Sequence, residues 1–160
     1  MNTLEKNGKV SVGEQIISNI LKEIGIKFIY DVSADNLKGV KNGNLRFDFC
    51  IPYDQEKMET IDEIKRGRCH DFLVIEYNGI FHYMILAGKT NRYTLSKQQM
   101  NDLIKNDYCR RRKIKILWIP YWILISDVKK IVCHFIQENK HQMVLENDLP
   151  CVCTNCLVQS

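Results

Sequence analysis

The chain has 160 residues, of which 45% are hydrophobic and 26% are charged, and this composition indicates one globular domain with a single core. No stretch approaches the roughly 20 consecutive apolar residues that a membrane-spanning helix needs, so we expect none. The formal net charge of +4 at pH 7 permits nucleic-acid binding but does not require it.

The first residues, MNTLEKNGK, lack the apolar centre of a signal peptide, so we expect an intracellular protein. The chain has seven cysteines, and four of them are scattered singly, which favours reduced thiols over a disulfide framework. Lysine, isoleucine and asparagine are abundant, as in proteins of AT-rich and often viral genomes. A viral protein of this kind would act in the cytoplasm or nucleus of its host.

A helix is predicted from Ser11 to Ile24, where isoleucine and leucine recur at helical spacing. Ser11 is a favourable N-cap residue, and Glu14 occupies the capping-box position three residues later. Gly25 is expected to end the helix.

Two strands are expected next, at Lys27–Val32 and at Leu45–Ile51, where Pro52 ends the second one. The segment Asp35–Asn44 between them is rich in glycine and asparagine and is interpreted as a loop. The charged segment Asp54–Cys69 has almost no apolar periodicity, so we interpret it as an insertion or a long loop.

A β-hairpin is predicted in the middle of the chain, from strands at Asp71–Tyr77 and Ile80–Leu86. The dipeptide Asn78-Gly79 between them is the strongest short-range hairpin signal. The remaining expected elements are a helix, a short buried strand and a last helix, at Ser96–Arg112, Lys115–Pro120 and Ser126–Asn139.

This order of elements indicates an α/β fold with a mixed central sheet flanked by helices. We expect residues 1–140 to form the domain and residues 141–160 to form a cysteine-containing tail.

Two carboxylates lie within the apolar strands, Asp48 in RFDFCIP and Glu76 at the end of FLVIE. Strand alternation would place Phe47 and Phe49 on one face of the sheet and Asp48 on the other. Carboxylates on neighbouring strands can hold Mg²⁺ or Mn²⁺, which activates water and stabilises charge on a phosphate. The alternative is that both acids simply face solvent.

In their order, these segments resemble the PD-(D/E)XK, or restriction-endonuclease-like, nuclease superfamily, over residues Ser11 to Val132. The segment GEQIISNILKEIGIKFIYD followed by RFDFCIP is similar to phage Holliday-junction resolvases. The segment IEYNGIFHY followed by QQMNDLIKNDYCRRRKIKILWIPY is similar to small viral, phage and very-short-patch-like endonucleases. The order of these motifs is more specific for fold than for activity.

The resemblance implies that Asp48, Glu76 and the backbone carbonyl of Tyr77 bind the metal. It further implies that Glu14 orients a metal-bound water, although the capping box alone also explains Glu14. His82 would act as a general acid or base or would contact phosphate, provided that the hairpin has a three-residue loop. A two-residue turn would put His82 on the sheet face opposite Glu76.

Gln98, Asp102 and Lys105 share one face of the predicted second helix, at i, i+4 and i+7. The resemblance implies that this face looks toward the site and contacts nucleic acid, and the alternative is a solvated face. A basic cluster follows, which either contacts phosphates or is an ordinary solvated surface: Arg110, Arg111, Arg112 and Lys113.

The chain departs from the superfamily at Asn78, where most members have lysine and the closer relatives have aspartate. Asparagine can orient a water or a phosphate oxygen, but it cannot act as a charged ligand or a base. It also suits an Asn-Gly turn. Lys89 and Lys105 are the candidates to supply the missing cation.

The tail contains three closely spaced cysteines, Cys151, Cys153 and Cys156, which together with His141 would make a zinc site. Only the last pair has the usual C-x-x-C spacing, so we favour reduced thiols without zinc.

The resemblance therefore implies a Mg²⁺-dependent endonuclease that hydrolyses phosphodiester bonds in DNA, with branched or mismatched DNA in repair or recombination as its substrate. Many relatives form dimers, so a homodimer is expected. The alternative is an inactive nuclease fold that binds nucleic acid or a protein partner, and Asn78 favours this alternative.

Overall fold

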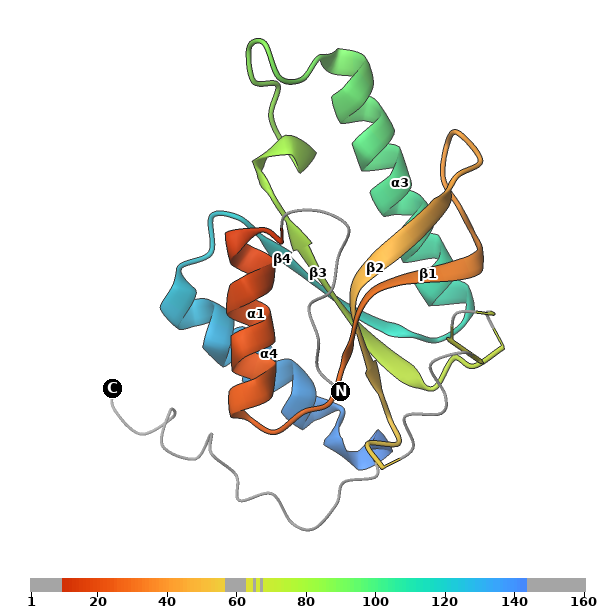
Figure 1. Cartoon of the computed structure of the whole chain (residues 1–160), viewed down its shortest axis with the longest axis vertical. Helices are drawn as coiled ribbons and strands as arrows, with labels where there is room; N and C mark the ends of the chain where they lie inside the picture. Colours follow the sequence, from red (N-terminus) through yellow and green to blue (C-terminus); the bar gives the residue numbers. More distant parts are fainter. Residues whose placement is uncertain (1–9, 57–62, 65, 67, 144–160) are drawn as a thin grey trace.

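The computed structural model describes residues 10–56, 63–64, 66 and 68–143. These residues form an α/β fold in which helices flank a mixed sheet, so the predicted α/β class with a mixed, helix-flanked sheet is confirmed (Figure 1). The sheet has four strands, which follow one another across it in chain order: β1 (Ile29–Lys38), β2 (Asn44–Pro52), β3 (Phe72–Asn78) and β4 (Lys115–Pro120).

Strand β2 is antiparallel to both β1 and β3, whereas β3 and β4 are parallel. A parallel pair needs a long crossover connection, and helix α3 (Arg92–Arg111) lies in the connection from β3 to β4. Strand β3 is therefore an inner strand with a neighbour on each edge, which explains why its sequence FLVIEYN is almost wholly buried.

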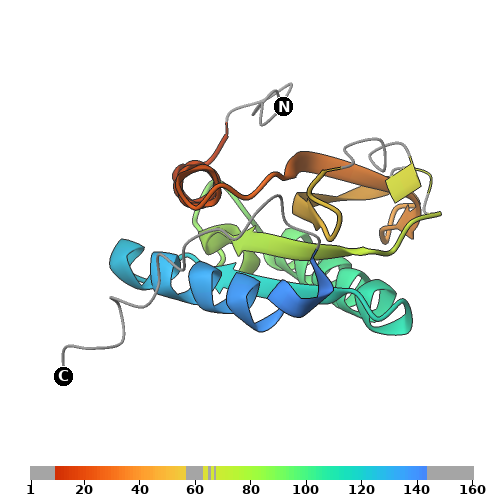
Figure 2. The same ribbon diagram turned by 90° about the horizontal axis from the view of Figure 1, so that it is seen from below.

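The two faces of the sheet are covered by different helices. Leu73 and Ile75 of β3 pack in one core cluster with α1 (Val12–Glu23) and α4 (Ile125–Glu138). Phe72 and Val74 pack in a second cluster with α3. Since successive strand residues point to opposite faces, α1 and α4 cover one face and α3 covers the other. Figure 1 shows α1 in front of the strands and α3 behind them, and Figure 2 shows α1 above the level of β3 and α3 below it.

Helix α1 begins and ends as predicted. The Ser11 hydroxyl accepts a hydrogen bond from the backbone N–H of Glu14, and the Glu14 carboxylate accepts one from the backbone N–H of Ser11. This reciprocal pair satisfies N–H groups that the first turn of a helix leaves without partners. Gly25 follows the helix with φ of 71°, a left-handed conformation that glycine adopts without steric cost.

Two predicted boundaries were wrong. Strand β1 continues to Lys38, so most of the expected loop Asp35–Asn44 is strand and hairpin turn. Helix α3 begins at Arg92, four residues before the expected Ser96, because the Asn91 side chain caps it by accepting from the backbone N–H of Thr94 at 2.9 Å. Strand pairing explains the first difference and side-chain capping the second, and neither appears in the pattern of apolar residues.

The predicted hairpin at Asn78-Gly79 was also wrong. Gly79 has φ of −66° and ψ of 173°, and Ile80–His82 form a short 3₁₀ helix, η1, where a strand was expected. Strand β3 already pairs with β2 on one edge and with β4 on the other, up to Asn78 beside Pro120. No edge of β3 is left for a returning strand, and this overrides the local turn signal.

Parts of two expected segments lie outside the described residues. The segment Asp54–Cys69, which was interpreted as an insertion or a long loop, is described only at its ends and at residues 63, 64, 66 and 68. The tail cysteines Cys151, Cys153 and Cys156 lie outside the described residues. His141 is described, and it is exposed in the short 3₁₀ helix η2 (Lys140–Gln142) after α4.

Candidate active site

The two predicted carboxylates meet where β2 and β3 separate. Ladder pairing of these strands ends at Phe49 beside Ile75, and Asp48 and Glu76 come next in the same register. Here side chains replace the backbone ladder. The backbone N–H of Asp48 donates to Oε1 of Glu76 at 3.2 Å, and the backbone N–H of Tyr77 donates to Oδ2 of Asp48 at 2.8 Å. Each carboxylate is thus held by the opposite strand.

The expectation that Phe47 and Phe49 share one face was wrong. Phe47 packs with Tyr108 of α3 at a ring-centroid distance of 6.0 Å, whereas Phe49 packs against Tyr30 at 5.3 Å in the other core cluster. The paired strand β1 has a kink at the same level, where Asp31 has φ of 55°. Both strands change faces at this level, and half-buried Asp48 lies at the point of change.

Glu76 is buried, with 2% of its surface exposed, and it contacts a buried lysine from α3. Nζ of Lys105 lies 2.6 Å from Oε2 of Glu76. Burial, reinforced by the negative charge of Asp48, raises the pKa of Glu76 from 4.5 to about 8, although Lys105 acts in the opposite direction. Asp48 and Glu76 therefore repel each other in a place with little water to screen them.

Glu14 lies on the α1 side of the acids, and both of its carboxylate oxygens have hydrogen-bond partners. Oε2 accepts from the backbone N–H of Ser11 at 2.7 Å, and Oε1 accepts from the Tyr30 hydroxyl at 2.8 Å. Burial, the hydrogen bond to Glu14 and the charges of Glu14 and Asp48 raise the pKa of Tyr30. The charges of Glu14 and Asp48 therefore both act on the Tyr30 hydroxyl. The sequence did not single it out, because a tyrosine in an apolar strand resembles any core residue.

On the α3 side, His82 joins the helix face that was predicted to look toward the site. Its Nδ1 lies 2.8 Å from Oδ2 of Asp102, and Nε2 of Gln98 lies 3.3 Å from each ring nitrogen. Lys105 on the same face reaches Glu76. Helix η1 delivers His82 to this cluster, so neither the three-residue hairpin loop nor the two-residue turn considered from the sequence occurs.

Asn78 ends β3 and is 6% exposed, so the turn interpretation of this residue was wrong. Its side-chain Nδ2 donates to the Tyr83 hydroxyl at 3.2 Å, and its backbone carbonyl oxygen accepts from the backbone N–H of Tyr121 at 2.9 Å. Its Oδ1 has no hydrogen-bond partner within the described part of the chain. A buried acceptor of this kind costs about 1–3 kcal/mol, so Asn78 leaves the site one unmet acceptor.

The basic cluster predicted to contact phosphates lies at the far end of α3. Eight residues separate Asp102 from Arg110, which is about 12 Å along a helix. Arg110 and Arg111 form ion pairs with Asp107 at 2.7 and 2.5 Å. Arg112 lies 3.8 Å above the ring of Tyr108. Lys113 follows the helix with φ of 58°. The structure does not bring this cluster to His82.

The pair Asp48 and Glu76 fits a divalent cation by its donor chemistry. Both are hard oxygen donors, both are oriented by backbone N–H groups, and their mutual repulsion would be relieved by added positive charge. The backbone carbonyl of Tyr77 was predicted to be a third ligand. The backbone N–H of the same residue donates to Asp48, so the Tyr77 backbone lies next to the two carboxylates. Among the described residues, no group of three or more histidine, cysteine or acidic side chains is placed to hold a metal ion, and Mg²⁺ often uses only one or two carboxylates with waters.

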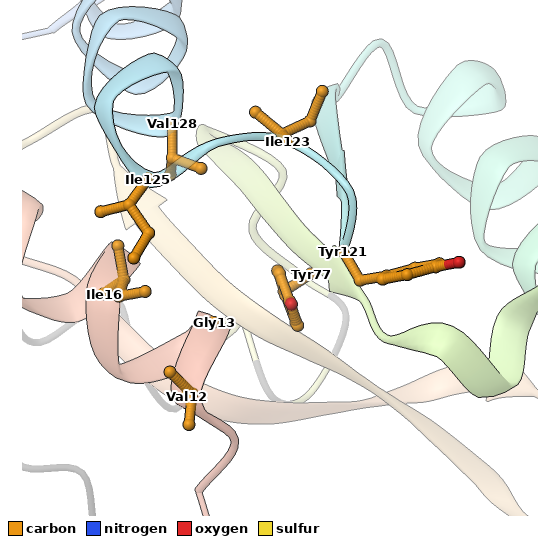
Figure 3. Close-up of a pocket in the computed structure, with 8 residues that line it drawn as sticks. All are labelled: Val12, Gly13, Ile16, Tyr77, Tyr121, Ile123, Ile125 and Val128. Carbon is orange, nitrogen blue, oxygen red and sulfur yellow. The ribbon is translucent and has the colours of Figure 1, made fainter.

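An apolar pocket of about 210 Å³ opens beside Tyr77, on the face covered by α1 and α4. Figure 3 shows Tyr77 between Gly13 of α1 and Tyr121 after β4. The sequence did not indicate this pocket, because its lining comes from distant segments: Val12, Gly13, Ile16, Tyr77, Tyr121, Ile123, Ile125 and Val128.

Comparisons of the chain with protein-family models, with curated proteins and with solved structures found no match. Over the described residues, none of the helices combines the length and the apolar character needed to cross a bilayer.

Proposed function

We propose that the chain is a metal-dependent nuclease of the restriction-endonuclease-like type that hydrolyses phosphodiester bonds in DNA, with Mg²⁺ or Mn²⁺ held by Asp48 and Glu76. The observation that carries this proposal is the meeting of the two carboxylates where β2 and β3 separate, each fixed by a backbone N–H of the other strand. Two carboxylates this close are unfavourable when both are ionised, and a divalent cation held by them would relieve that repulsion.

The bound metal would activate a water molecule and stabilise the charge that builds on the phosphate. Lys105 is the cation that Asn78 cannot supply, because its ammonium group already lies 2.6 Å from Glu76. With a metal held by Glu76, this ammonium group would be free to contact a phosphate oxygen of the substrate. Lys105, from α3, then replaces the superfamily lysine that would stand at position 78 in β3.

His82 is the proton-transfer group of this proposal. Asp102 lies 2.8 Å from Nδ1 of His82 and orients the ring, and the reacting oxygen would take the place of the Gln98 amide, which lies 3.3 Å from Nε2. A histidine held in this way can take a proton from water or give one to the leaving oxygen. Glu14, whose two oxygens accept from Ser11 and Tyr30, holds the Tyr30 side chain, whose pKa is also raised by the charge of Asp48. Duplex cleavage requires a cut in each strand, so the expected homodimer with two sites is retained.

The test is cleavage of supercoiled plasmid and of a four-way junction, with Mg²⁺, with Mn²⁺ and with EDTA. We expect metal-dependent cutting that falls about 100-fold or more in Asp48→Asn and in Glu76→Gln, because each removes a metal ligand. Asp127→Asn on α4 is the matched control, since this aspartate pairs with Lys130 at 3.6 Å on the surface. Mn²⁺ binding by calorimetry should be lost in the first two variants and kept in the control. Cutting that persists in Asp48→Asn would refute the assignment.

A second candidate function is metal-independent binding of nucleic acid by an inactive nuclease fold. The pairing of Lys105 with Glu76 favours it, because a lysine that neutralises Glu76 takes the place of a metal. Asn78 at the position of the superfamily cation favours it as well. A gel shift in EDTA, together with no cutting and no Mn²⁺ binding by the wild-type chain, would select this function over the first.

A further inference from the structure

Three aromatic side chains form an exposed cluster next to the candidate active site. The ring centroids of Tyr83 and Trp122 are 4.6 Å apart, those of Tyr121 and Trp122 are 5.3 Å apart, and those of Tyr83 and Tyr121 are 6.0 Å apart. Trp122 is 55% exposed and Tyr83 is 36% exposed. These rings pack against one another at interplanar angles of 43° to 82°, and Trp122 and Tyr83 keep part of their surface open to solvent.

Asn78 joins this cluster to the carboxylate pair. Its side-chain amide donates to the Tyr83 hydroxyl, and its carbonyl accepts from the backbone N–H of Tyr121. Asn78 stands two residues after Glu76 on β3, which is about 7 Å along a strand. His82 precedes Tyr83, and their ring centroids are 6.4 Å apart. The aromatic cluster therefore adjoins the end of the strand that carries Glu76.

We propose that Tyr83, Tyr121 and Trp122 form a stacking site for an unpaired nucleobase. Taken together with the proposed nuclease function, on which this inference rests, the site implies a substrate that is single-stranded next to the scissile phosphate. Base faces inside a duplex are covered by their neighbours, and only an unpaired base can offer a face to an aromatic ring. The formal net charge of +4 suits a chain that binds a polyanion.

The first test is fluorescence of Trp122 in EDTA, where no metal-dependent cleavage occurs. The chain has two tryptophans, so Trp118→Phe leaves Trp122 as the single reporter. We expect a 20-nucleotide oligothymidine to quench this fluorescence, and a fully paired duplex of the same length to bind at least about tenfold more weakly. Equal affinity for the two, or binding without quenching, would overturn the proposal.

The second test is anisotropy of the labelled oligothymidine with ring-removing variants. Trp122→Leu and Tyr83→Leu should each weaken binding about tenfold, because stacking on the ring is lost while apolar surface remains. Tyr83→Phe should keep most of the affinity because it keeps the ring. Tyr93→Leu is the matched control, since Tyr93 is 61% exposed on α3 but has no place in the cluster. Circular dichroism melts confirm that each variant folds. Unchanged binding in both cluster variants would overturn the proposal.

The cluster could instead cover a second protein chain, and the same reagents test this alternative. If the emission of Trp122 shifts with protein concentration in the absence of DNA, and light scattering shows a dimer that Trp122→Leu abolishes, the surface is a protein interface and the proposal fails. The binding assays need no cleavage, so they separate this inference from the nuclease proposal. Quenching by single strands without metal-dependent cutting supports the stacking site and refutes the nuclease proposal. Metal-dependent cutting together with unchanged binding in the cluster variants supports the nuclease proposal and refutes the stacking site.

Discussion

Glu76 is 2% exposed, although it ends a run of apolar residues at a point where a strand often reaches water. Its pKa of about 8 follows from burial and from the charge of Asp48, so the folded protein holds a proton there that an unfolded chain would release above its usual pKa of 4.5. The hydrogen bond from Lys105 limits this effect but does not reverse it. The same buried carboxylate is an unfavourable anion without a metal and a strong ligand with one.

At the residue scale we expect the metal-free protein to lose stability as pH rises between about 5 and 8. Below pH 4.5 Glu76 is protonated in both states, and its full contribution is present. As pH rises, the unfolded chain loses the proton first, so the free energy of unfolding falls by up to about 1.4 kcal/mol per pH unit until pH passes the folded pKa of about 8. Urea denaturation in EDTA at pH 5, 6.5 and 8 measures this.

Glu76→Gln is the control for that experiment, because glutamine cannot titrate but has nearly the same shape. As pH rises from 5 to 8, the free energy of unfolding of the wild type should fall relative to that of Glu76→Gln. A pH-independent difference would show that Glu76 has its ordinary pKa.

At the element scale, the site depends on where α1, β2 and β3 are placed. The hydrogen-bonded ladder of β2 and β3 stops at Phe49 and Ile75, and the space beyond it is filled by the two acids. Helix α1 approaches the end of β3 closely enough that a Cβ on Gly13 would lie 2.1 Å from Cζ of Tyr77. Gly13 lets the Tyr77 ring come this close, and a larger residue at this position would displace the ring.

We expect Gly13→Ala to lower the free energy of unfolding by about 1–2 kcal/mol, although alanine is the better helix former, because the Tyr77 ring must move. The shift would also alter the pocket that Tyr77 lines (Figure 3). Gly43→Ala is the matched control, since nothing lies within 4 Å of its added methyl group, and we expect a change within about 0.5 kcal/mol. Thermal melts of both variants compare them, and equal stabilities would contradict the close approach.

At the scale of the whole molecule, the sheet separates two apolar clusters. The cluster under α3 contains two free cysteines, Cys50 of β2 and Cys109 of α3, and both are fully buried. Burial raises the pKa of Cys109 to about 12 and also raises the pKa of Cys50. Neither thiol can react without opening of the cluster, because reaction needs both thiolate and access.

We therefore expect Cys50 and Cys109 to be alkylated by iodoacetamide at pH 8 about a hundredfold more slowly than Cys69, which is only half-buried. Peptide mass spectrometry after timed quenching gives the rate at each cysteine separately. In urea above the unfolding midpoint the three rates should converge. Fast native labelling of Cys109 would show that α3 opens from the sheet on its own.

Much of the fold was predictable, because it follows from patterns carried by neighbouring residues. The capping box of Ser11 and Glu14, the bounds of β4 and the apolar stripes of α1 and α4 were all expected from the sequence and are confirmed. The absence of the predicted hairpin at Asn78 was not predictable, because the turn signal is local, whereas the pairing of β3 with β4 brings in a strand about 40 residues further along the chain.

The sequence by itself determined which residues carry the candidate chemistry: Asp48 and Glu76 were identifiable as acids inside apolar strands. Only the tertiary structure decided how they are arranged, since the change of face at Asp48 depends on the kink in β1 at Asp31. It also decided that Lys105 reaches Glu76, and that Tyr83, Tyr121 and Trp122 come together beside Asn78. Spacing along one regular element predicts a side chain's face, but kinks such as the one at Asp31 and contacts between elements depend on packing that no single segment encodes.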